Sequence, residues 1–347
     1  MSKRTFYAAA HVVADPAADN GAGKQAVVDW DATMAFRHHL WSLGLGIADA
    51  MDTAQRGMGL DWAATQELIR RSGAEAKAVG GLLACGAGTD HLAAGTHPLN
   101  IIERAYAEQL DVVQSAGAQV ILMASRALAA SATGPADYRR IYGNLLTGVD
   151  QPVILHWLGD MFDPALAGYW GDASLDAAAE SVLAIIHENA AKIDGIKVSL
   201  LDPDREIALR AALPDGVRLY TGDDFNYPSL IESGSHALLG IFDAIAVPAA
   251  AALAALNAGD AAKFREILDP TVPLARHIFA APTFHYKTGI VFLAWLNGHQ
   301  EQFRMVGGQE HSRSLEHLVE LHRLAAGCGV LRDPELAAAR LATLVAP

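Results

Sequence analysis

The segment Ile193-Asp194-Gly195-Ile196-Lys197-Val198-Ser199-Leu200-Leu201 decides how the rest of this chain is interpreted. It has the length and apolar character of a buried strand, yet it carries a lysine near its centre. Burying an ammonium group is costly, and desolvation favours the uncharged amine, which is the form that attacks a carbonyl carbon. The segment therefore predicts a strand that presents Lys197 as a Schiff-base nucleophile. The alternative is a lysine at a strand end whose ammonium reaches water.

The composition is that of a globular protein with a sizeable core. Of 347 residues, 52% are hydrophobic and 19% are charged, unlike a disordered chain. The formal net charge of −13 argues against nucleic acid and anionic membranes as partners, because both attract basic surfaces. The two cysteines, Cys85 and Cys328, cannot build a disulfide framework, and they suit the reducing cytoplasm in which we expect the protein to act.

No segment has the pattern of a signal peptide or a membrane span. The N-terminus carries the basic pair Lys3-Arg4 but only a short apolar stretch. The longest apolar region, residues 237–256, contains Asp243 and Pro248. It therefore favours a strand, a turn and a helix over a membrane helix.

Short apolar runs alternate with longer amphipathic stretches along the chain. The runs expected as strands are residues 6–13, 47–51, 81–85, 120–123, 153–156, 195–199, 217–221 and 237–242. Between them lie helical patterns at 32–43, 62–78, 101–115, 138–146, 175–191, 205–213 and 227–233. Eight such units predict an α/β fold of the (β/α)8 TIM barrel type over residues 1–260. An open doubly wound sheet is the alternative, but no complete GxGxxG motif follows the first predicted strand.

Residues 261–347 are too many to be the last barrel helix alone. After a helical pattern at 249–257, further patterns occur at 261–268, 290–296 and 314–326. No low-complexity linker or charge run separates them from the barrel. We therefore expect a C-terminal helical extension that packs on the barrel as part of one structural unit.

Polar side chains follow the predicted strands, where (β/α)8 barrels carry their chemistry. The catalytic candidates are Lys197 and His156. The candidates for substrate binding are Asp52, Thr53, Ser125, Arg126, Ser199, Gly222, Asp223 and Asp224, and Asp243 closes the last predicted strand.

Taken in order, several of these motifs resemble the dihydrodipicolinate synthase and N-acetylneuraminate lyase family of class I aldolase barrels. Gly195-Ile196-Lys197 is similar to the Schiff-base strand of that family, and Thr221-Gly222-Asp223-Asp224 resembles its next strand end. The strand at 152–156 resembles the one that carries the family's proton-relay tyrosine. Weaker similarities lie at 28–30, 86–89, 255–260 and 285–296. The resemblance implies a covalent imine through Lys197 without a cofactor, and a homodimer or homotetramer.

The departures from the family concern the substrate. His156 stands where the family has its tyrosine on strand five, and Ser125-Arg126 replace a tyrosine after strand four. The family's glycine–threonine–threonine loop grips a keto-acid carboxylate, but here the loop reads Asp52-Thr53-Ala54-Gln55-Arg56. Asp52 would repel a carboxylate unless Arg56 or Arg126 compensates. The loop after strand five also carries extra residues, 161–174. We therefore expect a small hydroxylated carbonyl compound, either a keto acid or a sugar-like molecule.

Each candidate has a structural alternative. His156 could shuttle protons, because imidazole titrates near neutral pH, or it could be a buried histidine bonded to a neighbouring loop. Asp52, Asp223 and Asp224 could bind hydroxyl groups, but Asp223-Asp224 also suits a helix start, and we expect capping by at least one of the two.

The hydroxyls of Thr53 and Ser199 are candidate hydrogen-bond donors to the substrate. Arg126 could clamp an anionic group or form a surface salt bridge.

Two other functions stay open at this point. The fourteen histidines show no tight ligand spacing, but strand ends could still assemble a divalent metal site from His11, His156 and Asp52 or Asp224. That would make a metal-dependent isomerase or lyase. A non-catalytic, degenerate barrel used for binding is the second alternative, although it would have no reason to keep a buried lysine.

Overall fold

Each of the eight predicted apolar runs forms a strand in the computed structural model, which describes residues 3–345. The strands are β1 (Phe6–Ala9), β2 (Gly46–Asp49), β3 (Leu83–Ala87), β4 (Gln119–Leu122), β5 (Val153–Leu158), β6 (Ile193–Ser199), β7 (Arg218–Thr221) and β8 (His236–Leu239). They lie side by side in sequence order and close into a barrel, because β1 also pairs with β8. The prediction of a (β/α)8 barrel is confirmed. Residues 1, 2, 346 and 347, which the predicted ranges included, lie outside the described residues.

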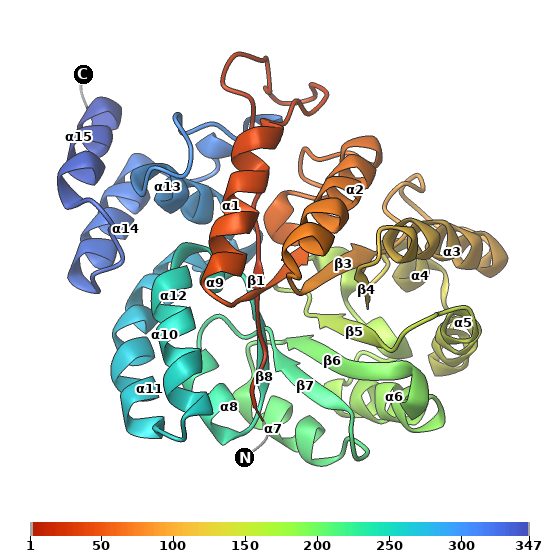
Figure 1. The fold of residues 1–347 in the computed structure, drawn as a ribbon. Coiled ribbons are helices and arrows are strands. Elements are labelled where there is room, and N and C mark those ends of the chain that lie inside the picture. Colours follow the sequence, from red (N-terminus) through yellow and green to blue (C-terminus); the bar gives the residue numbers. More distant parts are fainter. Residues whose placement is uncertain (1–2, 346–347) are drawn as a thin grey trace.

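The helices that follow the strands cover the outside of the barrel (Figure 1). They are α1 (Trp30–Ser42), α2 (Trp62–Val79), α3 (Leu99–Ser115), α4 (Arg126–Ser131), α5 (Pro135–Thr147), α6 (Leu175–Glu188), α7 (Pro203–Ala211), α8 (Tyr227–Ser233), α9 (Ile241–Ala244) and α10 (Ala246–Asn257). Aspartate side chains cap several of them, as Asp29 does for α1 and Asp202 for α7 by accepting hydrogen bonds from backbone amides. The short helices α4 and α9 were not predicted, because one or two turns give too few residues for a helical period.

The C-terminal extension is helical, as predicted. It consists of α11 (Ala261–Leu268), α12 (Val272–Ile278), α13 (Tyr286–Leu296), α14 (Leu315–Gly327) and α15 (Pro334–Val345). In Figure 1 the helices α13–α15 lie at the upper left, on the side toward which β1 runs, and the N-terminus lies at the opposite end. Because parallel strands all run the same way, the extension reaches the end of the barrel that carries active sites in this fold.

The ends of β1 and β8 differ most from the prediction. β1 stops at Ala9 and β8 stops at Leu239, because the chain turns into α9 at Ile241. Asp243 therefore lies inside α9 and not at a strand end. Its Oδ2 atom accepts a hydrogen bond from the His11 backbone N–H at 2.8 Å and lies 2.8 Å from His11 Nδ1, which ties the end of β1 to α9.

The core has two layers. Inside the barrel, a small cluster contains Tyr7, Ala9, Ala48, Met51, Ala84, Ile121, Ile154, Tyr220 and Leu238. A larger apolar layer lies between the strands and the helices. Side chains alternate along a strand, so His156, two residues after Ile154, also faces the barrel interior. The same alternation places Lys197 inside, because a Cβ on Gly195 would lie 2.8 Å from the ring of Tyr220.

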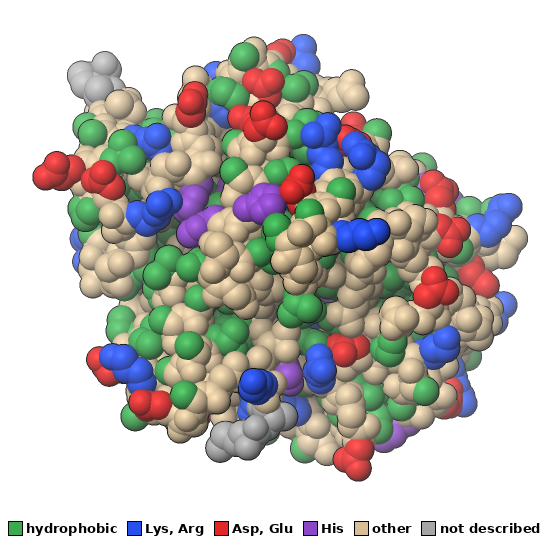
Figure 2. Space-filling model, viewed as in Figure 1, with side chains coloured by type: hydrophobic (Ala, Val, Ile, Leu, Met, Phe, Trp, Pro, Cys, Tyr) green, Lys and Arg blue, Asp and Glu red, His purple; other side chains and the backbone are tan. Residues whose placement is uncertain are grey.

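The surface mixes both signs of charge. On the face drawn in Figure 2, acidic and basic side chains are interspersed, and histidines gather where α1 meets the C-terminal helices. Within residues 3–345, the helices are all too short or too polar to cross a membrane.

Candidate active site

Lys197 is buried at the carboxyl-terminal half of β6, where its side chain is 8% exposed. It lies between His156 of β5 and Tyr220 of β7 in the strand register. Its amine has neither a hydrogen bond nor an ion pair within the described part of the chain. Burial lowers the pKa of Lys197, and the charges of Asp52 and Asp224 act in the opposite direction. The amine is therefore shifted toward its uncharged, nucleophilic form.

Gly222, at the end of β7, leaves the space that Lys197 occupies. A Cβ on this residue would lie 2.2 Å from Ser199 Oγ and 2.8 Å from Lys197 Cε. Since real Cβ atoms do not approach other atoms so closely, any larger residue here would displace the lysine or the serine. The predicted site residues Gly222 and Ser199 thus form the wall against which the lysine stem packs.

A small cavity surrounds the lysine. Its volume is about 10 Å³, which is room for about one water molecule. The predicted residues that line it with Lys197 are Asp52, Thr53, Ser199, Gly222 and Asp224. The structure therefore brings together most of the predicted substrate-binding set, although these residues come from three different strand ends, those of β2, β6 and β7.

The two neighbouring aspartates after β7 have different roles. Asp223 Oδ1 accepts hydrogen bonds from the backbone N–H groups of Phe225 and Asn226 at 2.8 and 2.9 Å, which orders the turn into α8. Asp224 faces the cavity and its Oδ1 accepts a hydrogen bond from Ile241 N at 2.8 Å. Burial raises the pKa of Asp224 to about 7, against the backbone hydrogen bond and the Lys197 charge. The prediction that one of the pair caps the following helix is wrong, because the N-cap residue of α8 is Asn226 and Asp223 orders only the turn before it.

His156 is buried beside the lysine. Its Nε2 lies 3.3 Å from Ser199 Oγ, and its side chain also lines a neighbouring cavity of about 600 Å³. Burial, with a smaller effect of the Lys197 charge, lowers the pKa of His156 well below its usual value. The imidazole is therefore neutral near pH 7. Of the two side chains, Asp224 titrates closer to neutral pH.

A tyrosine from the extension completes the cavity. Tyr286, the first residue of α13, lines it, and its hydroxyl lies 2.7 Å from Thr53 Oγ1. Sequence analysis placed His285-Tyr286-Lys287 in the extension but assigned it no role in the site. The sequence signal that could have suggested a tyrosine from elsewhere was the absence, after β4, of the tyrosine that the similar family has there. A one-dimensional pattern cannot show that α13 returns to the barrel mouth and brings a hydroxyl there.

Ser125 and Arg126 have structural partners at the start of α4. Ser125 Oγ accepts a hydrogen bond from Leu128 N at 2.9 Å and so caps this helix. Arg126 is more than half exposed, and its Nε donates to Asp163 Oδ2 at 2.6 Å, which is the salt bridge considered as the alternative. Both residues line the 600 Å³ cavity and so remain near the site.

Arg56 does not compensate Asp52. Its guanidinium donates to Asp90 Oδ1 at 2.7 Å, to Gln109, and to the backbone oxygens of Ala50 and Gly86. These acceptors occupy the donors of Arg56. The side chain of Asp52 forms neither a hydrogen bond nor an ion pair with any residue between 3 and 345.

Three cavities meet at the barrel mouth. The 10 Å³ cavity at Lys197, the 600 Å³ cavity beside His156 and a third of about 260 Å³ share the lining residues Asp52 and Leu158. The third cavity is lined in addition by Tyr286 and Lys287 from the extension. The small cavity at Lys197 therefore adjoins both of the larger spaces.

The metal-binding set considered from the sequence is not assembled. Across residues 3–345, no three or more His, Cys, Asp or Glu side chains are grouped so that they could hold a metal ion. His11, one member of that set, is paired with Asp243.

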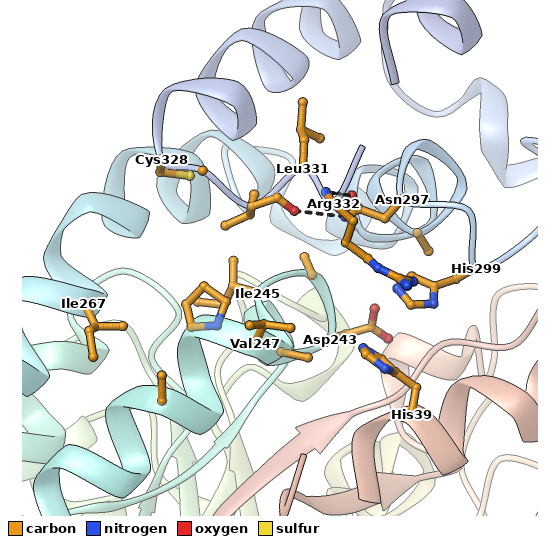
Figure 3. Close-up of a pocket in the computed structure, with 17 residues that line it drawn as sticks. His39, Asp243, Ile245, Val247, Ile267, Asn297, His299, Cys328, Leu331 and Arg332 are labelled. Atoms are coloured by element: carbon orange, nitrogen blue, oxygen red, sulfur yellow. Dashed lines mark hydrogen bonds between the residues drawn. The ribbon is translucent and has the colours of Figure 1, made fainter. Parts of the chain in front are cut away.

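A separate cavity of about 370 Å³ lies between the barrel and the extension. In Figure 3, Asp243 lies between His39 and His299, with Arg332 nearby, and Val247, Ile267 and Leu331 form apolar walls. It shares no lining residue with the cavity at Lys197.

The fold and the site define the chain as a (β/α)8 barrel with a buried, unpaired lysine amine at the carboxyl ends of its strands. The chain belongs to the family described as "Protein of unknown function (DUF993)", whose model matches residues 1–346. No curated protein matches the sequence.

Solved structures of the dihydrodipicolinate synthase family share the fold. Dihydrodipicolinate synthase from Aquifex aeolicus matches with a TM-score of 0.71 at 15% identity, covering 95% of this chain and 100% of that chain. YagE is an E. coli prophage protein of the dihydrodipicolinic acid synthase family that was solved in complex with pyruvate. It matches with a TM-score of 0.74 at 15% identity, covering 94% of this chain and 99% of that chain. The resemblance stated from the motifs is thus confirmed for the fold, at low sequence identity.

Proposed function

We propose that this protein is a Schiff-base-forming lyase or aldolase that acts on a small hydroxylated carbonyl compound through Lys197. The observation that carries the proposal is a buried amine without a partner, whose pKa is lowered by burial, at the catalytic end of a barrel. The shared fold of the dihydrodipicolinate synthase family supports it. An amine with a purely structural role would be expected to have a carboxylate partner.

The proposed reaction begins when the uncharged amine of Lys197 attacks the carbonyl carbon. A carbon–nitrogen bond forms, the carbonyl oxygen takes up a proton, and loss of water gives a protonated imine. For a carbon–carbon lyase, the hydroxyl on the carbon β to the imine loses a proton, the electron pair of the adjacent carbon–carbon bond moves into the protonated imine to form an enamine, and an aldehyde leaves. For a carbon–oxygen lyase, loss of a proton from the carbon next to the imine forms the enamine, which expels the β oxygen with the electron pair of its bond, and that oxygen takes up a proton. Protonation of the enamine carbon after carbon–carbon cleavage, and then hydrolysis of the imine by water in either case, returns the lysine.

Four side chains of the site can take part in the proton transfers and hydrogen bonds of these steps. Asp224, with a pKa of about 7, can accept and return a proton at neutral pH. The Thr53–Tyr286 hydroxyl pair lies on the same cavity and can donate a hydrogen bond to a developing alkoxide. His156 contributes as a neutral hydrogen-bonding group next to Ser199. In this proposal no cofactor is required.

The finer predictions from the resemblance belong to the same proposal. We expect a homodimer or homotetramer in the cytoplasm, a small-molecule carbonyl substrate, and neither nucleic acid nor membrane as partner. Asp52 fits substrate hydroxyl groups better than a carboxylate beside the imine, because it is an acceptor without a partner.

Borohydride trapping tests the proposal. The protein is incubated with pyruvate, hydroxypyruvate, dihydroxyacetone and several keto-sugars, reduced, and analysed by intact and peptide mass spectrometry. We expect a reduced adduct on the Lys197 peptide with at least one of these carbonyls. In Lys197→Ala the adduct should be lost, and turnover of that compound should fall by about a thousandfold or more.

Lys263→Ala is the matched control, because Lys263 is an exposed lysine in an ion pair with Glu266. It should trap as the unmodified protein does. Equal trapping in Lys197→Ala, or adducts only on exposed lysines, would contradict the proposal.

A further inference from the structure

Lys287 is a second buried lysine, in the first turn of α13, and it is 4% exposed. Its amine donates to the Phe284 backbone oxygen at 3.1 Å and to Met58 Sδ at 3.3 Å, and it lies 4.7 Å from the centre of the Tyr286 ring. An ammonium has three donors, and a thioether is a weak acceptor. In the described part of the chain, no carboxylate oxygen lies within 4 Å of this amine, although buried cations usually have such a partner.

The position of Lys287 makes its amine available to a ligand. Lys287 lines the 260 Å³ cavity together with two other cations, Arg56 and Arg126. Those two are paired with Asp90 and Asp163, at 2.7 and 2.6 Å. Of the three cations, Lys287 alone has no carboxylate among the described residues to neutralise it.

This cavity continues into the space around Lys197. Four residues line both: Asp52, Leu158, Phe162 and Tyr286. The space at Lys197 holds about one water molecule, which is enough for a reacting carbonyl group but not for the remainder of a substrate. The remainder of the substrate therefore extends outward, and one of its two paths leads past Asp52 to Lys287.

We infer that Lys287 binds the anionic end of the substrate, so that the substrate is a hydroxylated carbonyl compound with a carboxylate or phosphate remote from its carbonyl carbon. The inference rests on the proposed function, since it takes the carbonyl carbon to lie at Lys197. A carboxylate next to the carbonyl would instead face Asp52 and Asp224, whose charges both act on Lys197. Asp52 lies on the path between the two amines and accepts hydrogen bonds from substrate hydroxyls.

The electrostatics of Lys287 agree with this role. Burial lowers the pKa of its amine to about 8, the charge of Arg126 lowers it further, and the charges of Asp52 and Asp163 act in the opposite direction. The amine is thus still mostly protonated at pH 7, and a bound anion would stabilise that charge.

The first test compares matched neutral and anionic carbonyls in the trapping experiment. The pairs are dihydroxyacetone with dihydroxyacetone phosphate, and the methyl ester of 4-oxopentanoate with 4-oxopentanoate. In the unmodified protein and for at least one pair, the concentration that gives half-maximal trapping at Lys197 should be about tenfold lower for the anionic member than for the neutral one. The pair that shows the preference distinguishes phosphate from carboxylate. Lys287→Met should trap the neutral members as before and lose the preference.

Two further variants separate charge from structure. Lys287→Arg keeps a cation at the position and should retain part of the preference, and Lys263→Met, on the exposed face of α11, should retain all of it. A Lys287→Met protein that melts within a few degrees of the unmodified chain establishes that the fold is intact. Should it unfold, Lys287→Gln takes its place.

The second test does not depend on imine formation. Binding of inorganic phosphate and of glutarate is measured by calorimetry in Lys197→Ala and in Lys197→Ala/Lys287→Met. We expect at least one anion to bind Lys197→Ala about tenfold more tightly than the double variant.

If anion binding depends on Lys287 while no carbonyl is trapped at Lys197, the proposed function fails and the anion site stands. If carbonyls are trapped at Lys197 with a preference that Lys287→Met does not change, or if neither anion needs Lys287, the inference is overturned.

Discussion

Gly222 offers a test of the site that leaves every charged group in place. A methyl group at this position would collide with Ser199 Oγ and Lys197 Cε, at 2.2 and 2.8 Å. We expect Gly222→Ala to slow imine formation by about tenfold or more, because a misplacement near 1 Å is costly for a reacting group. The measurement is the rate of borohydride-trapped adduct with the best carbonyl found for the unmodified protein.

The matched control is Gly143→Ala. Gly143 lies within α5, and a Cβ there would meet no atom within 4 Å. This change should leave the trapping rate unaltered and slightly stabilise the helix. A Gly222→Ala protein that forms the adduct at the normal rate would show that Lys197 is not held against this wall.

At the scale of elements, a buried ion pair connects α1 to the barrel. Arg37 of α1 donates to both carboxylate oxygens of Asp49, at the end of β2, at 2.9 and 2.7 Å, and both side chains are fully buried. Arg37 also donates to the His11 backbone oxygen at 2.7 Å, and Ser72 of α2 donates to Asp49 at 2.5 Å. The pair therefore fixes α1 and α2 against the first two strands.

Removing one partner should cost more stability than removing both. We expect Arg37→Met to lower the free energy of unfolding by about 3 kcal/mol or more, because Asp49 would keep a buried, uncompensated charge. Arg37→Met combined with Asp49→Leu should recover part of this loss. Urea unfolding measures both variants.

Arg323→Met serves as the comparison, since Arg323 and Glu320 form an exposed pair within one helix. It should cause no measurable change. A double variant less stable than Arg37→Met would mean that packing, and not the unpaired charge, determines the loss.

At the scale of the whole molecule, Glu206 contributes a pH dependence to stability. This carboxyl group of α7 is 1% exposed and accepts hydrogen bonds from Thr221 and Ser235, at 2.9 and 2.8 Å. Burial raises its pKa to about 7 from an ordinary value of 4.5, against these hydrogen bonds. The folded state thus holds this proton more tightly than the unfolded state, and the stabilisation is full below about pH 4.5 and is lost as the pH rises through 7.

Glu206→Gln should remove that dependence. The free energy of unfolding of Glu206→Gln is compared with that of the unmodified protein at each pH. Relative to the unmodified protein, the variant should be more stable at pH 8 than at pH 4.5, by up to about 3 kcal/mol. Denaturant unfolding at several pH values measures it, with Glu335→Gln at the exposed start of α15 as the control for losing one carboxylate. A difference that stays constant with pH would contradict the assignment.

The sequence by itself determined the eight strands, most of the barrel helices and the lysine of β6. These features are local: alternation of apolar runs with amphipathic stretches, and one cation in an apolar strand, can be recognised without any distant contact. Of the eight residues that it predicted for substrate binding, the structure places Asp52, Thr53, Ser199, Gly222 and Asp224 around Lys197.

Only the tertiary structure decided which polar residues are available. Asp223 and Asp224 are adjacent in sequence, yet Asp223 accepts hydrogen bonds from the turn before α8 and Asp224 lines the cavity at Lys197. Arg56 is paired with Asp90, more than thirty residues away. Tyr286 and Lys287 come to the site from α13, over 80 residues after Lys197. Hydrogen-bond partners and burial depend on such long-range packing, and burial determines which amine or carboxyl group is uncharged at neutral pH.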